Sequence, residues 1–288
     1  MSRVWDDGVG VRLLADGGTW LEGPCWTPEG VLVSDIPANR VLRWNGAEGW
    51  DVVVADAEFA NGRTRTADGR IIQCSHGRRA VEELLPDGTS RTLVDHFGAA
   101  RLNSPNDVVV AADGAVWFSD PPYGIVQAHE GHPGDREYGD NFVFRLDPRT
   151  GEVRPVVVDV EEPNGLAFSP DCRTLYVADT SAALRKDGSG NRRIRAYDVV
   201  DAAACKNGRT LAEMTYGLAD GFRVDVEGRI WTSDGPNVTV LSPAGELVDT
   251  IEIGRTVGNV CFGPSGDLYV AASDALFLIR THTQGAQW

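Results

Sequence analysis

Several features that define common protein classes are missing from this chain of 288 residues. No run reaches 18 apolar residues, so the sequence predicts no segment that spans a bilayer. The five cysteines are odd in number and lack CxxC spacing, which argues against a disulfide framework. The N-terminus, residues 1–7, lacks the apolar stretch of a secretory signal, and this favours a cytoplasmic protein.

Positive charge is also scarce. The chain has 27 Lys and Arg residues against 42 Asp and Glu residues, a formal net charge of −15. Such a surface repels phosphates, so we expect neither a nucleic-acid partner nor binding to anionic membrane surfaces. We therefore expect the binding partner to be a small molecule.

Familiar catalytic motifs are absent as well. There is no GxSxG nucleophile elbow, no Walker loop and no Rossmann glycine fingerprint. The segment 129–132 (HEGH) is one residue short of the zincin HExxH motif, and we expect it to lie on the surface. The segment 187–191 (DGSGN) begins like a calcium loop but lacks its later glycine and glutamate, so it predicts a plain turn.

The chain does contain a unit that occurs six times, at intervals of about 40–55 residues. Each unit opens with a polar residue beside Gly or Asp, continues into a short apolar strand, turns at Gly or Pro, and returns as a second strand that ends in a small residue. Third strands follow in all six units and fourth strands in five. The opening residues are Glu22, Asn61, Asn106, Asn164, Asp220 and Asn259.

This repeat predicts an all-β fold, a single six-bladed β-propeller over residues 1–288 with four-stranded blades. The sixth unit lacks a fourth strand, and a spare strand stands before the first unit, at about residues 9–16. We expect this N-terminal strand to complete the sixth blade, because a ring closed in that way leaves no long open sheet edge.

The repeat also predicts where the working face lies. Second strands return to the face from which first strands start, so the residues that follow them should stand near the six openers. These residues are Asp35, His76, Asp120, Asp179, Asp234 and Asp274. The two longest loops, 121–141 and 180–193, leave from the same ends, and we interpret them as lids over a binding site.

The six openers should converge on the axis, where they would form a set of hard oxygen donors. One Glu, one Asp and several Asn suit Ca²⁺, or Mg²⁺ and Mn²⁺, better than Zn²⁺ or copper. The alternative interpretation is that each Asn or Asp caps its own turn through its side chain. Six equivalent positions that point to one axis favour the metal site.

Five motifs in order resemble the senescence-marker-protein-30/gluconolactonase family over nearly the whole chain, and bacterial gluconolactonases in particular. The motifs are 22–24 (EGP), 102–107 (LNSPND), 119–124 (SDPPYG), 163–170 (PNGLAFSP) and 220–221 (DG). The resemblance implies a six-bladed propeller that hydrolyses sugar lactones with one divalent metal at its axis. It implies Ca²⁺ as the ion, with Mg²⁺, Mn²⁺ and Zn²⁺ as alternatives.

Matched motif by motif, the resemblance implies Glu22, Asn164 and Asp220 as metal ligands. Asn106 falls where family members place a further ligand or a substrate contact. Asn61 and Asn259 complete the ring by repeat position only, and we do not assign them as ligands. One departure concerns Ser104, which stands where mammalian members carry an Arg that helps to hold the sugar, so the sugar preference stays open.

The expected reaction is hydrolysis of an aldono-lactone such as D-glucono-1,5-lactone to D-gluconate. The metal would bind the carbonyl oxygen and stabilise the oxyanion, while a carboxylate takes the proton of the attacking water. The resemblance implies Asp220 as that base, with Asp107 and His76 as alternatives. The expected substrate contacts are Asn106, Asp107, Tyr123, Asp120 and His76, although Asp120 would equally serve to cap the turn into the loop 121–141.

Two other functions remain open from the sequence. The same site would suit an organophosphate or other ester hydrolase, and a non-catalytic propeller would use the metal only for structure. The acidic ligand set and the two long loops favour an enclosed small-molecule site.

Overall fold

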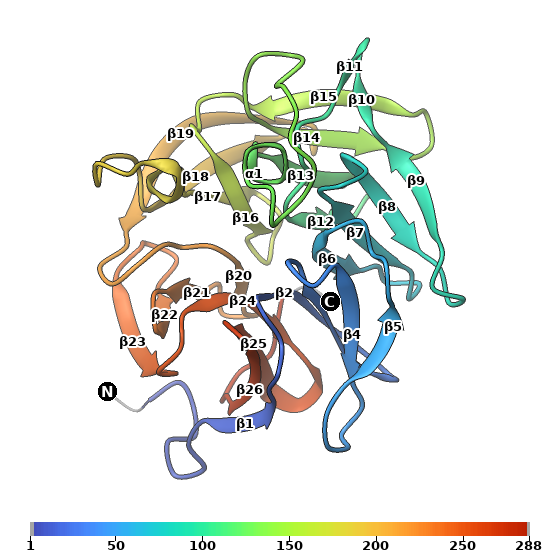
Figure 1. Cartoon of the computed structure of the whole chain (residues 1–288). Helices are drawn as coiled ribbons and strands as arrows, with labels where there is room; N and C mark the ends of the chain where they lie inside the picture. The colour runs from blue at the N-terminus through green and yellow to red at the C-terminus, as the bar shows by residue number, and fades with distance from the viewer. Residues whose placement is uncertain (1–2, 287–288) are drawn as a thin grey trace.

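Six four-stranded antiparallel sheets surround one axis in the computed structural model, which describes residues 3–286 (Figure 1). In five sheets the strand order follows the chain from the axis to the rim. The predicted all-β six-bladed propeller is therefore confirmed. The segment 1–7, in which the sequence shows no secretory signal, begins with Met1 and Ser2, and these two residues lie outside the described residues.

Each blade begins with an inner strand close to the axis. The six inner strands are β2 (Leu21–Thr27), β6 (Ala60–Arg65), β12 (Val108–Val110), β16 (Pro163–Phe168), β20 (Phe222–Val224) and β24 (Val257–Phe262). The second strands are β3 (Gly30–Asp35), β7 (Ile71–Ser75), β13 (Val116–Asp120), β17 (Thr174–Asp179), β21 (Ile230–Asp234) and β25 (Asp267–Ala272).

The outer half of each blade has two further strands. The third strands are β4 (Arg40–Trp44), β8 (Ala80–Leu84), β14 (Phe142–Asp147), β18 (Arg193–Val200), β22 (Asn237–Leu241) and β26 (Ala275–Arg280). The fourth strands of the first five blades are β5 (Asp51–Val54), β9 (Ser90–Val94), β15 (Glu152–Val157), β19 (Ala204–Glu213) and β23 (Leu247–Glu252).

The sixth blade is closed by the N-terminal strand, as predicted. Strand β1 (Arg12–Ala15) pairs antiparallel with β26, with Arg12 opposite Leu278. The order in this sheet is β1-β26-β25-β24, so the two ends of the chain meet in one blade. An added bridge between Trp5 and Thr281 extends the contact between the two ends.

Tight turns between the first and second strands fix the strand boundaries. Gly69, Gly114 and Gly228 occupy equivalent turn positions with φ between +81° and +90°, where a side chain is strained. The fourth blade has Cys172 at this position, with φ of +56°. The turn geometry is therefore kept even where glycine is absent.

The hydrophobic core is divided among the gaps between blades. Six clusters of buried side chains each join two neighbouring sheets, for example Trp117 of the third blade against Phe168 of the fourth, whose ring centroids are 5.1 Å apart. Because the sheets pack on both faces, most of the second strands are rich in Val, Leu and aromatic residues. The blades are thus held rigidly around the axis.

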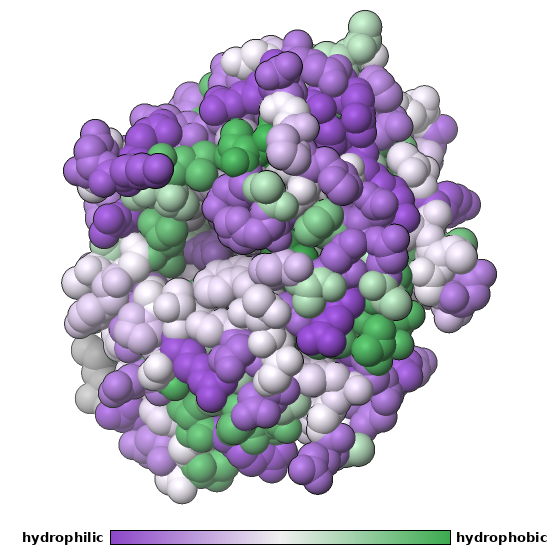
Figure 2. Space-filling view, viewed as in Figure 1, coloured by the Kyte–Doolittle hydropathy of each residue, from purple (hydrophilic) through white to green (hydrophobic). Residues whose placement is uncertain are grey.

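A few short elements were not predicted. They are the hairpin of β10 (His96–Phe97) and β11 (Ala100–Arg101), the helix α1 (Tyr123–Val126), and the 3₁₀ helices Ser181–Leu184 and Pro264–Gly266. No helix within residues 3–286 has the length and apolar character needed to cross a membrane. Figure 2 shows hydrophilic residues over most of the face seen in Figure 1, with apolar residues in separate patches.

Candidate functional site

Neighbouring inner strands approach each other closely where the predicted openers stand. The N–H of Gly62 donates to the carbonyl oxygen of Asn106 over 2.8 Å, and that of Gly165 donates to the carbonyl oxygen of Asp220 over 2.9 Å. A Cβ atom on either glycine would collide with the neighbouring backbone. Glycine beside the opener therefore lets the polar residues of adjacent blades converge.

One carboxylate oxygen of Glu22 accepts hydrogen bonds and the other accepts none among the described residues. Oε2 accepts hydrogen bonds from the N–H of Gly23 (2.6 Å) and from Nδ2 of Asn259 (3.1 Å). Oε1 is buried and has no hydrogen-bond partner within residues 3–286. Burial, and next the charge of Asp220, raise the pKa of Glu22 well above its usual value. A cation would relieve both penalties.

Asp220 lies close to Glu130, Asn164 and Asp107. Burial, followed by repulsion from Glu130, raises the pKa of Asp220 to about 7, while a hydrogen bond from Asn164 lowers it. The N–H of Asp220 donates to Oγ of Ser233 over 2.7 Å, which fixes the backbone. The residue as a whole is half-buried, so part of it remains open to a ligand.

Asn164 is oriented by a chain of hydroxyl groups. Its Nδ2 donates to Oγ1 of Thr180 over 3.2 Å, and that oxygen also lies 2.6 Å from the hydroxyl of Tyr123. Tyr123 belongs to α1 and Thr180 follows β17, so two of the predicted lid segments meet here. With its nitrogen directed at Thr180, Asn164 has its amide oxygen available to a cation.

His76 connects the axis to the loop 121–141. Nδ2 of Asn61 lies 3.0 Å from Nε2 of His76, and Nδ1 of His76 lies 3.0 Å from the carbonyl oxygen of Glu130. Because a carbonyl only accepts, Nδ1 carries the proton and Nε2 accepts from Asn61. Burial lowers the pKa of His76 to about 4, so the ring is neutral at pH 7.

Glu130 corrects the expectation that segment 129–132 lies on the surface. The side chains of His129 and His132 are 64% and 62% exposed, but that of Glu130 is 18% exposed. Burial raises the pKa of Glu130, and its charge acts on Asp220. The loop thus brings a carboxylate to the site that no sequence motif identified.

The carboxylate of Asp107, beside the third blade, is paired with a residue of the fifth blade. Its Oδ1 accepts from the N–H of Val108 (2.9 Å), and its Oδ2 forms an ion pair with Nη1 of Arg223 (3.2 Å). The carboxylate is 1% exposed. Asn106, beside it, is 6% exposed and has no side-chain hydrogen bond within residues 3–286.

Asp120 is buried in the framework under the loop. Its Oδ2 accepts from the N–H of Asn103 and the hydroxyl of Tyr138, both over 2.7 Å. Equivalent acids after other second strands also accept backbone N–H groups from the segment before their own inner strand. They are Asp35, Asp179 and Asp234. These acids share the predicted face, and the structure shows that they hold its loops.

The donors at the axis fit a hard divalent cation. Within residues 3–286 no three His, Cys, Asp or Glu side chains gather as a metal group, so a cation would need amide oxygens beside Glu22 and Asp220. The buried, unpartnered Oε1 of Glu22 supplies one donor, and a Cβ on Gly258 would lie 2.6 Å from it. Carboxylate and amide oxygens of this kind suit Ca²⁺.

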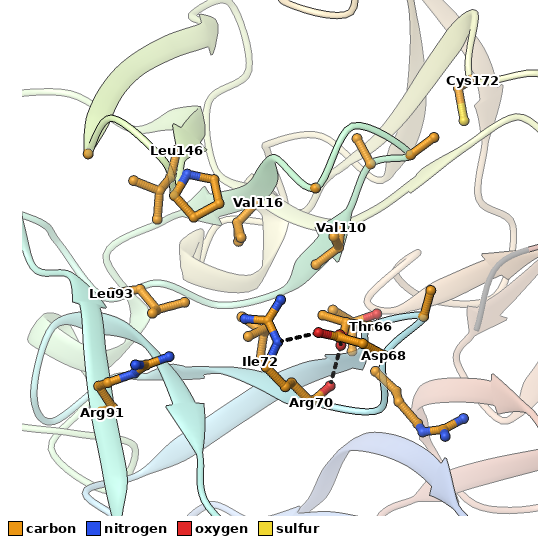
Figure 3. Close-up of a pocket in the computed structure, with 18 of the residues that line it drawn as sticks. Thr66, Asp68, Arg70, Ile72, Arg91, Leu93, Val110, Val116, Leu146 and Cys172 are labelled. Atoms are coloured by element: carbon orange, nitrogen blue, oxygen red, sulfur yellow. Dashed lines mark hydrogen bonds and ion pairs between the residues drawn. The ribbon is translucent and has the colours of Figure 1, made fainter.

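A cavity of about 780 Å³ lies away from these residues, between the turns of the second, third and fourth blades. Figure 3 shows its apolar side chains, among them Leu93 and Val116, with Arg70 beside Asp68. Arg70 and Asp68 already form an ion pair of 2.9 Å. Among the described residues that line this cavity, Asp68 is the one acid and it is already paired, so the axis is the better candidate for chemistry.

Comparison with known proteins identifies the family of the chain. The sequence model of the SMP-30/Gluconolactonase/LRE-like region matches residues 20–274. A gluconolactonase of Zymomonas mobilis is 30% identical, over 99% of this chain and 85% of that protein.

Two solved structures extend the comparison. The gluconolactonase XC5397 of Xanthomonas campestris is 37% identical with a TM-score of 0.85, over 94% of this chain and 89% of that one. The calcium-binding protein regucalcin of Agrobacterium tumefaciens, at 17% identity and a TM-score of 0.73 over 96% and 95% of the two chains, shares the fold. The protein therefore belongs to the SMP-30/gluconolactonase/LRE-like family.

Proposed function

We propose that this protein hydrolyses a sugar lactone, with D-glucono-1,5-lactone as the expected substrate and D-gluconate as the product. The observation that carries the proposal is the unpartnered Oε1 of Glu22 beside Asp220. Gluconolactonases among the relatives support the substrate class.

The residues that would hold a divalent cation are Glu22, Asn164 and Asp220, with Asn106 as a further donor. Two carboxylates balance the charge of the ion, and the amide oxygens add donors without adding repulsion. Ca²⁺ is the expected ion, because it prefers carboxylate and amide oxygens, with Mg²⁺, Mn²⁺ and Zn²⁺ as alternatives. When bound, such an ion supplies positive charge that polarises a lactone carbonyl.

Asp220 is the residue best placed to take a proton from the attacking water. Asp220 is half-buried, so part of the residue is open to a ligand, and a carboxylate is the group that accepts the proton of water in general base catalysis. The alternatives are less suitable in this geometry. Asp107 is committed to Arg223, and Nε2 of His76 already accepts a hydrogen bond from Asn61.

The substrate hydroxyl groups would meet Asn106, Tyr123 and Glu130 near the axis. Ser104, which stands where an Arg would hold the sugar, donates to the carbonyl of Pro121 (2.7 Å) and accepts from the N–H of Gly124 (2.9 Å), so it belongs to the framework. Glu130 is the residue that we expect to contact the sugar in place of that Arg. A sugar hydroxyl both donates and accepts hydrogen bonds, so it can donate to the carboxylate of Glu130 where it would have accepted from Arg. Asp120 and His76 then act by positioning the loop.

Acid release from D-glucono-1,5-lactone tests the proposal. Protein stripped with EDTA should match the spontaneous rate, and protein reloaded with Ca²⁺ or Mn²⁺ should exceed it. An organophosphate triester and a simple aryl ester in the same assay separate lactone hydrolysis from general ester hydrolysis. If no metal-loaded sample exceeds the spontaneous rate with the lactone, the proposed function is wrong.

A further inference from the structure

Asp107 and Arg223 form a buried ion pair that joins two blades beside the proposed cation site. Oδ2 of Asp107 lies 3.2 Å from Nη1 of Arg223, and the two side chains are 1% and 12% exposed. Asp107 directly follows Asn106, and Arg223 comes shortly after Asp220, so both residues are close in the chain to proposed ligands. The pair links the start of the third blade to the inner strand of the fifth.

The guanidinium group of Arg223 contacts groups from three blades. Nη1 also donates to the carbonyl oxygen of Phe222 (2.7 Å), and Nη2 donates to the carbonyl oxygen of Arg63 in the second blade (3.3 Å). The other oxygen of the Asp107 carboxylate, Oδ1, accepts from the N–H of Val108 (2.9 Å). Both oxygens of Asp107 therefore have a partner, and the carboxylate is fixed in place.

The three acids at the starts of inner strands differ in whether a cation already balances them. Asp107 is balanced by Arg223, whereas Glu22 and Asp220 have no ion pair within residues 3–286. Burial is the main cause that raises the pKa values of Glu22 and Asp220, and the charge of Asp107 adds to the rise in both. Asp107 therefore lies within electrostatic reach of the other two carboxylates. One divalent cation would balance Glu22 and Asp220, with Asp107 left to Arg223.

Without Arg223, the Asp107 carboxylate would be buried and unpaired. A buried carboxylate without a partner is costly, so another positive charge nearby would attract it. A cation held by Glu22 and Asp220 would supply that charge, because hard cations such as Ca²⁺ take carboxylate oxygens as ligands. Arg223 and the bound cation would therefore compete for the same carboxylate.

We propose that Arg223 is a positioning residue that keeps Asp107 out of the ligand set of the cation. The inference deepens the proposed function and rests on it, because it assumes a cation between Glu22, Asn164 and Asp220. Two carboxylate ligands balance the charge of a divalent ion. A third carboxylate would make the site net negative and would weaken the attraction of the ion for a lactone carbonyl oxygen.

Arg223→Met tests the proposal through the affinity for the ion, which is measured without turnover. Calorimetry with Ca²⁺ should show that Kd falls about 10-fold, because the charge of the ligands sets the affinity of such sites. Loss of a residue that merely supports the ligands would instead weaken binding, typically by about 10–100-fold. A Kd that is unchanged or higher in Arg223→Met would overturn the proposal.

Eu³⁺, which takes the place of Ca²⁺ in oxygen sites, shows whether Asp107 itself binds the ion. Luminescence lifetimes in H₂O and D₂O give the number of water molecules bound to Eu³⁺. Arg223→Met should bind at least one fewer than wild type, because a carboxylate oxygen displaces water, and adding Asp107→Ala should restore the wild-type number. An equal number in wild type and Arg223→Met would overturn the proposal, as would a low number that persists without Asp107.

Arg229→Met is the matched control for the loss of a buried arginine. Arg229 belongs to the same blade and pairs with Asp225 over 2.7 Å, and the two side chains are 15% and 0% exposed. Arg229 precedes β21, at the end of the blade away from Asp220, so this variant should keep the wild-type Kd and water number. Changes equal to those of Arg223→Met would overturn the proposal, because they would not depend on Asp107.

The same measurements separate this inference from the proposed function. A wild type that binds neither Ca²⁺ nor Eu³⁺ would overturn both, whereas a wild type that binds them and an Arg223→Met that behaves identically would overturn the positioning role alone. If Arg223→Met does not fold, wild-type crystals soaked in Mn²⁺ still test the proposal. We expect no contact between the ion and Asp107 in such crystals, and a contact would overturn the inference.

Discussion

Asn259 of the sixth blade donates a hydrogen bond to Oε2 of Glu22 in the first blade over 3.1 Å, although the two residues are 237 positions apart. The bond joins the blades at which the ring closes and leaves Oε1 of Glu22 as the unpaired oxygen at the axis. Closure of the propeller and formation of the proposed metal site therefore share one carboxylate.

Replacing Glu22 by Gln should separate the stability of the metal-free protein from its response to metal. Glu22→Gln removes a buried carboxyl group whose ionised form burial and Asp220 disfavour, so the EDTA-treated variant should be more stable than wild type. Added Ca²⁺ should raise the unfolding midpoint of wild type and leave that of the variant nearly unchanged. Urea unfolding with and without Ca²⁺ measures both effects, and equal Ca²⁺ stabilisation of the two proteins would remove Glu22 from the ligand set.

Asp220→Asn should abolish turnover and preserve the fold. The change removes the proposed base and one charge from the proposed ligand set, so kcat should fall by about 10³-fold or more. Asp274→Asn is the matched control, because Asp274 pairs with Arg255 and is 47% exposed. Steady-state rates with gluconolactone and circular dichroism of both variants provide the measurement. Wild-type turnover in Asp220→Asn would show that another residue is the base.

Acid should destabilise the protein through His76. The folded-state pKa of about 4 lies below the usual value of 6.5, so the unfolded chain binds more protons between these values and stability falls as pH falls. The loss should be about 1 kcal/mol from pH 7 to pH 5.5 and about 3 kcal/mol in total.

The raised carboxyl pKa values of Glu22 and Asp220 act with the opposite sign, because the folded state then binds more protons than the unfolded chain and stability rises as pH falls. The His76 effect must therefore be taken as the difference between wild type and His76→Gln in urea unfolding at each pH. If this difference did not change with pH, His76 would not titrate as its burial predicts.

Glu130 should determine preference for hydroxylated lactones. Glu130→Ala should lower kcat/KM about 10-fold for gluconolactone, the loss of one hydrogen bond to a charged group, and leave hydrolysis of δ-valerolactone nearly unchanged. Asp135→Asn, an exposed acid of the same loop, should affect neither substrate. An equal loss on both lactones would assign Glu130 to loop structure, and no loss on either would remove it from the site.

The architecture follows from local sequence rules. Turn residues and apolar strands recur in each unit, so the strand positions agree with the structure to within a few residues, and the spare strand at 12–15 pairs with β26 as expected. The hairpin β10–β11 was missed because each of its strands has two residues, too few to show any periodicity.

Side-chain roles at the site were harder to predict, because the partners come from distant parts of the chain. Asp107 is matched by Arg223, 116 residues later, and no local pattern links the two. The backbone carbonyl of Glu130 accepts a hydrogen bond from His76, 54 residues earlier. The repeat identified the polar opening residues and the face of the propeller on which they lie. Hydrogen bonds and ion pairs between blades decide which of these side chains have no partner.

The central claim is that one divalent cation binds at the axis between Glu22, Asn164 and Asp220. Diffraction from crystals soaked in Mn²⁺, with data collected at the manganese absorption edge, tests it most directly. We predict a single strong anomalous peak in contact with oxygen atoms of these three side chains. A map with no peak there, or with the manganese bound only elsewhere on the molecule, would contradict the claim.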